Sequence, residues 1–281
     1  MRLRALLIAG LLSLTGLTAH AAPAPPKTVE LYTMDCGRIH EKDADEYADD
    51  GAYKGQARDL IVPCFLIRHP EGDLIWDTGL PQAIFDLPDH HNAYGMSVTR
   101  TLTDQLKALG LTPGDIKYLS VSHSHYDHIG NGNLFAASTW IVDEDERAYA
   151  FRPQARADKQ EFGAYSALED ARTILIKGDG DYDVFGDGSV VIVQAPGHTP
   201  GHTVLLVRLK QAGPVLLTGD MWHMAESRAA RRVPRFNTDR AQTLRSMDKV
   251  EALAAATHAR VVREHVQQDF DALPKFPQPL R

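Results

Sequence analysis

Three histidines and one aspartate stand within six consecutive residues, His123-Ser-His125-Tyr-Asp127-His128. Neutral imidazoles and carboxylates are the side chains that hold zinc and similar divalent metals. Because side chains alternate along an extended chain, positions 123, 125 and 127 point the same way, and a turn at 128 brings the fourth donor beside them. Burying four such groups together is costly unless a metal takes their lone pairs. The cluster therefore predicts a metal site.

Three further candidate metal ligands follow at wide intervals, each just after a run of apolar residues. They are His198 after 189–194, Asp220 after 214–219 and His265 after 260–263. The first cluster likewise follows the apolar run 116–121. Such runs predict strands, and ligands bind at the ends of strands in an open sheet. We expect all these donors to meet at one edge of a sheet.

The sequence predicts both strands and helices, and these elements bring the donors together. Strands are expected near 28–35, 60–68, 73–77, 116–122, 139–142, 173–177, 189–194, 203–209, 214–219 and 260–263, and helices at 99–110 and 239–256. Asn237 or Thr238 is the expected N-cap of the second helix. Segments 82–98, 148–170 and 222–237 show no regular pattern, and we expect them to be loops that wall the substrate pocket.

The motifs resemble those of the metallo-β-lactamase superfamily, and within it the bacterial N-acyl homoserine lactonases. The matching stretches are LYTMDCG at 31–37, WDTGLP at 76–81, HSHYDHIGNG at 123–132, PGHTPGH at 196–202 and LLTGD at 216–220. This resemblance runs from about 29 to about 276. It implies an α/β fold, an αββα sandwich of two mixed β-sheets flanked by helices, as a single catalytic domain over 22–281.

The resemblance also implies two divalent metal ions per chain. One is held by His123, His125 and His198, the second by Asp127, His128 and His265, and Asp220 bridges both. Zinc is the default metal for these ligands, and iron, cobalt and manganese bind the same donor atoms. Asp77 is a candidate hydrogen-bond partner of a metal-bound histidine, and His202 is expected to support the site rather than to bind metal.

Two bridged metals lower the pKa of bound water, so that a hydroxide nucleophile exists at neutral pH. The resemblance thus predicts opening of lactone rings, with Asp127 passing a proton to the leaving alkoxide. Asp220 argues against a β-lactamase, because zinc β-lactamases carry sulfur or a small residue there. Many lactonases have a tyrosine three positions after this aspartate. Here the residue is His223, either a donor to the substrate carbonyl or a part of the pocket wall.

Other functions remain open beside the N-acyl homoserine lactonase. The alternative is an exported dimetal hydrolase of the same fold that acts on organophosphate triesters, aryl esters or β-lactams, and the triesterase is the most credible of these because it shares the signal peptide and Asp220. A long apolar groove favours the lactonase, and a tight aromatic cup favours the triesterase. A mononuclear iron dioxygenase is disfavoured by the complete set of seven ligands, and the diiron module of a flavoprotein is disfavoured by the absence of an appended flavodoxin-like domain. A non-enzymatic binding protein needs no such set of ligands.

The N-terminus has the pattern of a secretory signal peptide. Arg2 and Arg4 precede the apolar stretch 5–17, and Ala19-His20-Ala21 has the small residues of a cleavage site. The alternative is a membrane anchor, but the apolar stretch is short for one. We expect a mature protein from 22 onward that is exported, periplasmic or secreted, and not held in a membrane.

The net charge of the chain limits the classes of molecule that the protein is expected to bind. Formal net charge is −7, and removal of Arg2 and Arg4 leaves 28 − 37 = −9, which argues against nucleic acid as a partner. A small-molecule substrate is expected, and a monomer and a homodimer both remain open.

In an exported protein, Cys36 and Cys64 form a disulfide or stay as buried thiols. Four arginines at 228, 231, 232 and 235 form either a solvated loop or a rim that meets an anionic part of a substrate.

Overall fold

The computed structural model describes residues 22–281, and the predicted signal segment 1–21 lies outside the described residues. Within 22–281 the strands form a sheet of seven, in the order β4-β1-β2-β3-β5-β6-β7, and a sheet of five, in the order β12-β11-β10-β9-β8. The first sheet contains β1 (Glu30–Glu41), β2 (Arg58–His69), β3 (Gly72–Trp76), β4 (Met96–Ser97), β5 (Tyr118–Ser120), β6 (Thr139–Asp143) and β7 (Thr173–Ile176). The second contains β8 (Tyr182–Asp183), β9 (Val190–Gln194), β10 (Thr203–Leu209), β11 (Gly213–Leu217) and β12 (Arg260–Val262).

Most of the helices are short. The α-helices are α1 (Leu102–Ala108), α2 (Tyr126–Ile129), α3 (Glu144–Ala150), α4 (Pro153–Ala157), α5 (Lys159–Gly163), α6 (Ser227–Ala230), α7 (Arg240–Thr257) and α8 (Gln267–Asp271). The 3₁₀ turns are η1 (Ala44–Tyr47), η2 (Gln82–Asp86), η3 (Pro88–His90), η4 (Pro113–Asp115), η5 (Gly132–Phe135), η6 (Ser166–Asp170) and η7 (Gly219–Met221). Among the helices of residues 22–281, none has the length and apolar character that a membrane crossing requires.

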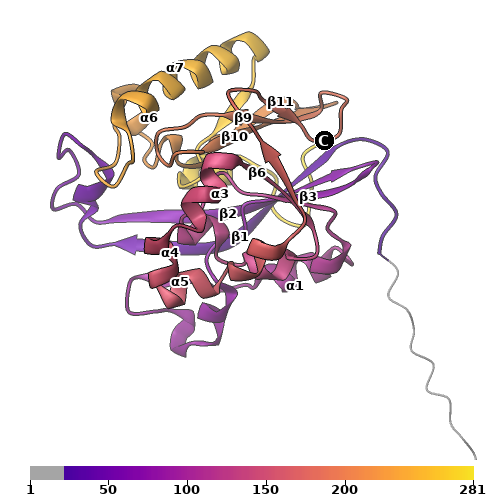
Figure 1. The fold of residues 1–281 in the computed structure, drawn as a ribbon, viewed down its shortest axis with the longest axis horizontal. Helices are drawn as coiled ribbons and strands as arrows, with labels where there is room; N and C mark the ends of the chain where they lie inside the picture. The colour runs from indigo at the N-terminus through magenta and orange to yellow at the C-terminus, as the bar shows by residue number, and fades with distance from the viewer. Residues whose placement is uncertain (1–21) are drawn as a thin grey trace, which may run out of the picture.

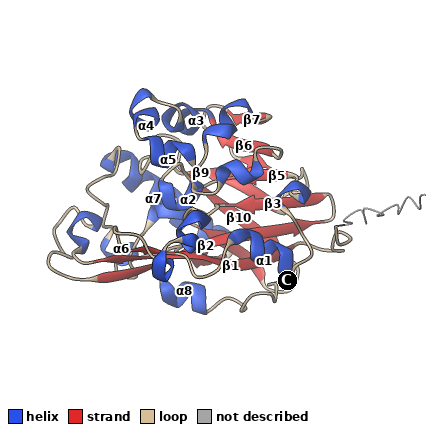
Figure 2. Cartoon of the chain, turned by 90° about the horizontal axis from the view of Figure 1, so that it is seen from below, coloured by secondary structure: helices blue, strands red, loops and turns tan. Residues whose placement is uncertain are grey.

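Neighbouring residues of one strand pack into different cores, which shows how the layers stack. Phe65 of β2 and Leu205 of β10 share the core between the two sheets. Leu66 packs on the opposite face of β2 with residues of α1, and Leu206 packs on the opposite face of β10 with residues of α7. Each sheet is thus apolar on both faces and needs a helix layer outside it. Figures 1 and 2 show these layers, which confirm the predicted αββα sandwich.

Segment 148–170 differs from the sequence prediction. The chain there is helical, with the end of α3, the five-residue helices α4 and α5, and η6. Pro153 opens α4, and the side chain of Asp158 caps α5. A helix of one turn is too short to show a repeating apolar pattern, so the sequence gives no helical signal. The two-residue strands β4 and β8 are likewise too short to show alternation.

The predicted N-cap of α7 is wrong. Asp239 caps this helix, and its side chain accepts a hydrogen bond from the backbone N–H of Gln242. Asn237 and Thr238 contact His198 instead: Nδ1 of His198 lies 3.3 Å from Oδ1 of Asn237, and the N–H of Thr238 donates to the His198 carbonyl. The polar residues before α7 therefore serve a candidate ligand as well as the helix.

A disulfide joins Cys36 in β1 to Cys64 in β2, 28 residues apart in sequence. Both side chains are buried in the core that lies under α1. The sequence left a pair of free thiols open as the alternative, and the structure shows the bonded form. β1 and β2 are therefore joined covalently as well as by their backbone hydrogen bonds.

Candidate metal centre

The candidate ligands lie just beyond the ends of four strands. His123–His128 follow β5 and run into α2, His198 follows β9, Asp220 lies in η7 after β11, and His265 follows β12. Gly219 allows two of these strand ends to approach closely. A Cβ atom on Gly219 would lie 2.6 Å from Cβ of Ser122 and 2.7 Å from Nε2 of His202, and its φ of +48° also favours glycine.

One group of donors gathers on the Oδ2 side of Asp220. The ligand atoms of His123, His125, His198 and Asp220 all lie within 4.8 Å of one another. Oδ2 of Asp220 lies 3.3 Å from Nε2 of His123 and 3.2 Å from Nε2 of His198. His125 reaches the group through Nδ1, which lies 3.1 Å from Nε2 of His198. Three imidazoles and one carboxylate oxygen thus surround one point.

A second group gathers on the other oxygen of the same carboxylate. Oδ1 of Asp220 lies 3.1 Å from Nε2 of His128 and 2.8 Å from Nε2 of His265. Oδ2 of Asp127 lies 3.4 Å from Nε2 of His265 and 3.7 Å from Nε2 of His128. Asp220 therefore stands between two sets of three donors, with one oxygen toward each set.

The donors of this centre fit metal ions. Nε2 of His123 and Oδ1 of Asp220 are buried, and neither makes a hydrogen bond of acceptable geometry within residues 22–281, although other donor atoms of the centre lie 2.8 to 3.3 Å away. Buried polar atoms without partners are costly, and a bound cation would satisfy both. Burial lowers the pKa of His123 and His125 well below the usual value, which favours the neutral form that binds metal. For His128 and His265 burial also lowers the pKa, but the Asp220 carboxylate raises it above the usual value. The nitrogen and carboxylate-oxygen set suits two divalent ions.

Hydrogen bonds behind the histidines turn their Nε2 atoms toward the centre. In each of three rings, Nδ1 faces an oxygen acceptor and fixes the tautomer. The acceptors are Oδ2 of Asp77 for His128 at 2.9 Å, the carbonyl of Ile61 for His265 at 2.9 Å, and Oδ1 of Asn237 for His198 at 3.3 Å. The contact between Asp77 and His128 agrees with the role that the sequence predicts for Asp77.

Glu264 is a supporting residue that the sequence analysis missed. Its side chain is buried, and Oε1 accepts hydrogen bonds from Nε1 of Trp76 at 3.2 Å and from the N–H of Gly219 at 3.0 Å. Burial, together with the nearby Asp77 carboxylate, raises the pKa of Glu264 well above its usual value. Glu264 thus ties the end of β3 to the turn that carries Asp220. Adjacency to His265 was the one signal in the sequence.

Aromatic rings form a wall beside the centre. Nε2 of His223 lies 3.0 Å from Oδ2 of Asp220, and the ring of Tyr47 meets the His223 ring edge-on, with 5.2 Å between centroids. Phe236 lies 5.6 Å from His223 and 5.8 Å from His198 by ring centroids, and it is 40% exposed. The wall therefore reaches from the buried carboxylate to the surface. Tyr47 is too far from the ligands in sequence to be identified with them.

The cluster of arginines after Asp220 is neutralised within the chain. The four ion pairs are Arg228–Glu251, Arg231–Asp248, Arg232–Asp50 and Arg235–Asp45. The last two join the loop that carries Phe236 to the segment that carries Tyr47. Pairing to carboxylates disfavours the interpretation of these arginines as a rim for anionic substrates, and it gives them a part in holding the wall in place.

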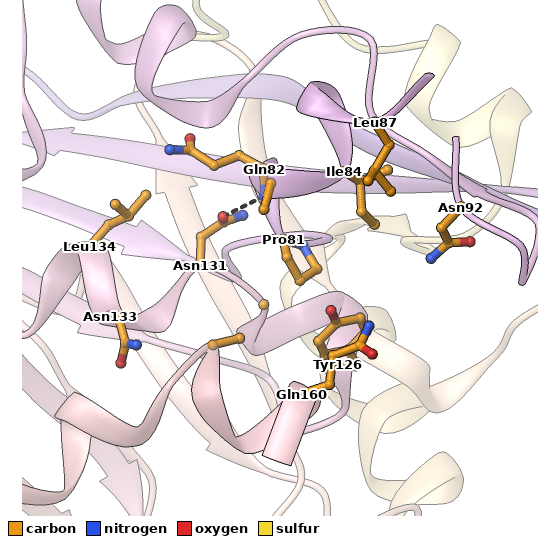
Figure 3. A pocket seen from close by; sticks show the side chains of 13 residues that line it. Pro81, Gln82, Ile84, Leu87, Asn92, Tyr126, Asn131, Asn133, Leu134 and Gln160 are labelled. Atoms are coloured by element: carbon orange, nitrogen blue, oxygen red, sulfur yellow. Dashed lines mark hydrogen bonds between the residues drawn. The ribbon is translucent and has the colours of Figure 1, made fainter. Parts of the chain in front are cut away.

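A cavity of about 430 Å³ opens next to the HSHYDH segment (Figure 3). Its lining is mainly apolar and includes Pro81, Ile84, Leu87, Tyr126 and Leu134. Tyr126 lies between His125 and Asp127 in sequence, and none of the seven candidate ligands is itself among the lining residues. Two of the three segments predicted as pocket walls, 82–98 and 148–170, contribute lining residues. The third, 222–237, carries the wall of His223 and Phe236 instead.

Comparison with known proteins places the chain among proteins that share these features. The model of the metallo-β-lactamase superfamily matches residues 57–260. The N-acyl homoserine lactonase AttM of Azorhizobium caulinodans is 35% identical over 261 residues, which cover 88% of this chain and 96% of that protein. The residues matched by the family model, 57–260, include six of the seven candidate ligands, and His265 lies just beyond them.

Solved structures agree in fold. The crystal structure of a quorum-quenching N-acyl homoserine lactone lactonase superposes with a TM-score of 0.75 at 26% identity, covering 91% of this chain and 100% of the other. An N-acyl homoserine lactone hydrolase with the product N-hexanoyl-L-homoserine at its catalytic metal centre superposes with a TM-score of 0.73 at 26% identity. That pair covers 90% of this chain and 100% of the hydrolase.

Proposed function

The chain belongs to the metallo-β-lactamase superfamily, and we propose that it hydrolyses the lactone ring of N-acyl homoserine lactones. The relatives that match it over most of their length carry this activity in their names. The candidate metal centre has the donors that such a hydrolysis requires. The product-bound relative carries an N-acyl homoserine at its metal centre, which is the class of molecule proposed here.

Two zinc ions are the proposed cofactors. His123, His125 and His198 would hold one, Asp127, His128 and His265 the other, and Asp220 would bridge them through its two oxygens. When bound, the metals supply a nucleophile from water at neutral pH and polarise the carbonyl oxygen. Burial of this donor set, which strengthens electrostatic interactions inside the site, suits that chemistry.

Two side chains of the centre have proposed roles beyond holding metal. Asp127 is 17% exposed, compared with 4% for Asp220, so it faces the open side of the centre. We assign it the proton that the leaving alkoxide takes up when the ring opens. We assign His223 the role of a donor to the substrate carbonyl, and its ring lies beside those of Tyr47 and Phe236.

The apolar cavity beside Tyr126 is the observation that favours a lactone with an acyl tail. We infer that the amide-linked chain of a lactone at the metals extends toward Tyr126, where Ile84, Leu87 and Leu134 offer an apolar surface. Compact triesters and β-lactams do not need this space. Burying an alkyl chain contributes about 0.8 kcal/mol per methylene, so longer chains should bind more tightly until the cavity is full.

Export is part of the proposal. The signal-like segment 1–21 would be removed, leaving 22–281 as one catalytic domain in the periplasm or outside the cell. The disulfide between Cys36 and Cys64 supports this location, because such bonds persist in oxidising compartments. Fractionation of the producing cells, together with the N-terminal sequence of the mature protein, tests it.

Turnover of a substrate panel by the purified protein tests the proposed activity. We expect kcat/KM to rise from butanoyl to longer-chain homoserine lactones and to exceed the values for a paraoxon-type triester and a chromogenic cephalosporin. Ala164→Trp, which fills the cavity, should reduce kcat/KM for the longest chain and spare the shortest. Leu175→Trp, at an exposed position on β7, is the matched control. Faster turnover of the triester would replace this proposal with the triesterase.

A further inference from the structure

Glu146 is a fully buried carboxylate outside the ligand set. It lies in the first turn of α3, where Asp143 caps the helix by accepting hydrogen bonds from the N–H groups of Asp145 and Glu146. Only 1% of Glu146 is exposed, and its two oxygens point away from α3 toward the segments that carry candidate ligands. A buried carboxylate is costly unless hydrogen bonds satisfy both oxygens.

Each oxygen of Glu146 holds a different ligand segment. Oε1 accepts from the N–H of Ser124 at 2.7 Å and from its hydroxyl at 2.6 Å. Oε2 accepts from the hydroxyl of Thr199 at 2.5 Å and from the N–H of Gly201 at 3.2 Å. Ser124 stands between His123 and His125, and Thr199 directly follows His198.

The chain around Gly201 is shaped to reach this carboxylate. A Cβ atom on Gly201 would lie 2.4 Å from the backbone nitrogen of Glu146 and 2.7 Å from its Cβ atom. The turn that carries His198 therefore packs directly against the first turn of α3. Only glycine fits where the chain at Gly201 comes this close to Glu146. The same close contact brings the N–H of Gly201 within hydrogen-bond distance of Oε2.

We propose that Glu146 is a positioning residue for the metal set of His123, His125 and His198. It joins the segments on both sides of that set and so fixes the distance between their imidazoles. This inference rests on the proposed metal centre and not on the identity of the substrate. The second set, with Asp127, His128 and His265, has its own supports in Asp77 and Ile61 and does not depend on Glu146.

The chemistry of the contacts requires a carboxylate and not merely a side chain of this shape. Both backbone partners are N–H donors, which cannot reverse direction. In Glu146→Gln one acceptor oxygen becomes an NH₂ group, which would face the N–H of either Ser124 or Gly201. One ligand segment must then move away, even though the volume of the side chain is unchanged.

Metal titration of chelator-treated protein with Zn²⁺, and with Co²⁺ for its absorption spectrum, tests the proposal. Supports behind metal ligands typically change metal affinity by about 10–100-fold. We expect Glu146→Gln to weaken one of the two binding steps by at least about tenfold, leave the other unchanged, and alter the Co²⁺ spectrum of the weakened site. Two unchanged binding steps in a folded variant would overturn the proposal.

Thr199→Val provides a milder variant in case Glu146→Gln does not fold. It removes one hydroxyl donor to Oε2 at nearly constant volume and leaves the N–H of Gly201 in place. We expect a smaller weakening of the same binding step. Asp73→Asn is the matched control, because it disrupts a buried carboxylate that pairs with Arg68 away from the centre. It should lower stability with both metal affinities intact, and loss of metal there would show that destabilisation alone explains the effect.

These titrations are independent of the substrate. If Glu146→Gln loses one metal but the wild type turns over no lactone, the positioning role stands and the proposed function fails. If the wild type hydrolyses lactones and Glu146→Gln binds both metals normally, the proposed function stands and the positioning role of Glu146 fails. For the active enzyme, we expect Glu146→Gln to lower kcat about tenfold or more with KM nearly unchanged, because the cavity that holds the acyl chain does not include Glu146.

Discussion

The backbone N–H of Asp220 donates a hydrogen bond to Nε2 of His202 across 3.1 Å. The other ring nitrogen of His202 faces the carbonyl of Ala195 at 3.1 Å, so Nδ1 carries the proton and Nε2 is the acceptor. Burial lowers the pKa of His202 to about 3, which keeps the ring neutral. The second histidine of the PGHTPGH motif thus holds the backbone of the carboxylate that stands between both donor sets.

Removing this acceptor should loosen Asp220. In His202→Ala the N–H of Asp220 loses its partner inside a buried site, and we expect the free energy of unfolding to fall by about 1–3 kcal/mol in a urea titration. His40→Ala, at an exposed ring, should change it by less than about 0.5 kcal/mol. Equal stability of the two variants would contradict the supporting role of His202.

Asp220→Asn tests the bridge itself. An amide has nearly the same shape, but it lacks the charge and the second acceptor oxygen that would join two metals. We expect hydrolysis to fall by more than about 100-fold and the metal content to drop below two ions per chain, while the circular dichroism spectrum stays that of the folded protein. Full turnover with full metal content would show that Asp220 is not a bridge.

The two donor sets should be separable by mutation. Of the two donor sets, His265 belongs to the one on the Oδ1 side of Asp220, so His265→Ala should lower the metal content from two ions per chain to one. Elemental analysis of carefully purified protein measures this and also identifies the native metal, for which we expect zinc. The prediction is wrong if the wild type holds at most one ion and the variant holds the same amount.

Substitution of His223 can distinguish between two roles of this residue. As a donor to the substrate carbonyl, its replacement by alanine should lower kcat by about 100-fold or more and leave the metal content intact. His223→Tyr should restore part of the rate, because a phenol can donate as well. The 3.0 Å contact with Asp220 suggests the other role, that of orienting the carboxylate. In that case His223→Ala loses metal together with rate, and wild-type kcat and KM would exclude both roles.

The disulfide should contribute measurably to stability. Closing a loop between Cys36 and Cys64, 28 residues apart, restricts the unfolded chain by about 3–4 kcal/mol in the loop-entropy estimate. We expect the double variant Cys36→Ser with Cys64→Ser to unfold at lower urea concentration by a corresponding amount, with kcat unchanged. Addition of a reductant to the wild type should lower the unfolding midpoint, and no shift in either experiment would show that the bond is absent in solution.

The local part of the centre follows from the order of the residues along the chain. His123, His125, Asp127 and His128 are brought together by five peptide bonds, so their spacing alone predicts a metal site. Long apolar runs such as those of β9, β10 and β11 were equally readable, because alternation and β-branched residues persist over several positions. Short elements such as α4, α5 and β8 could not be predicted, because one helical turn or two strand residues are too few to show a repeating apolar pattern.

The contacts between residues that are far apart in sequence depend on how the chain folds. The division of Asp220 between two donor sets depends on β11 and β12 pairing in parallel and on both sheets ending at the same edge. The supporting residues Glu146 and Glu264 reach their partners across 22 to 188 positions of sequence. A buried acid has no sequence pattern of its own, because its role depends on which donors the packing brings within hydrogen-bond distance.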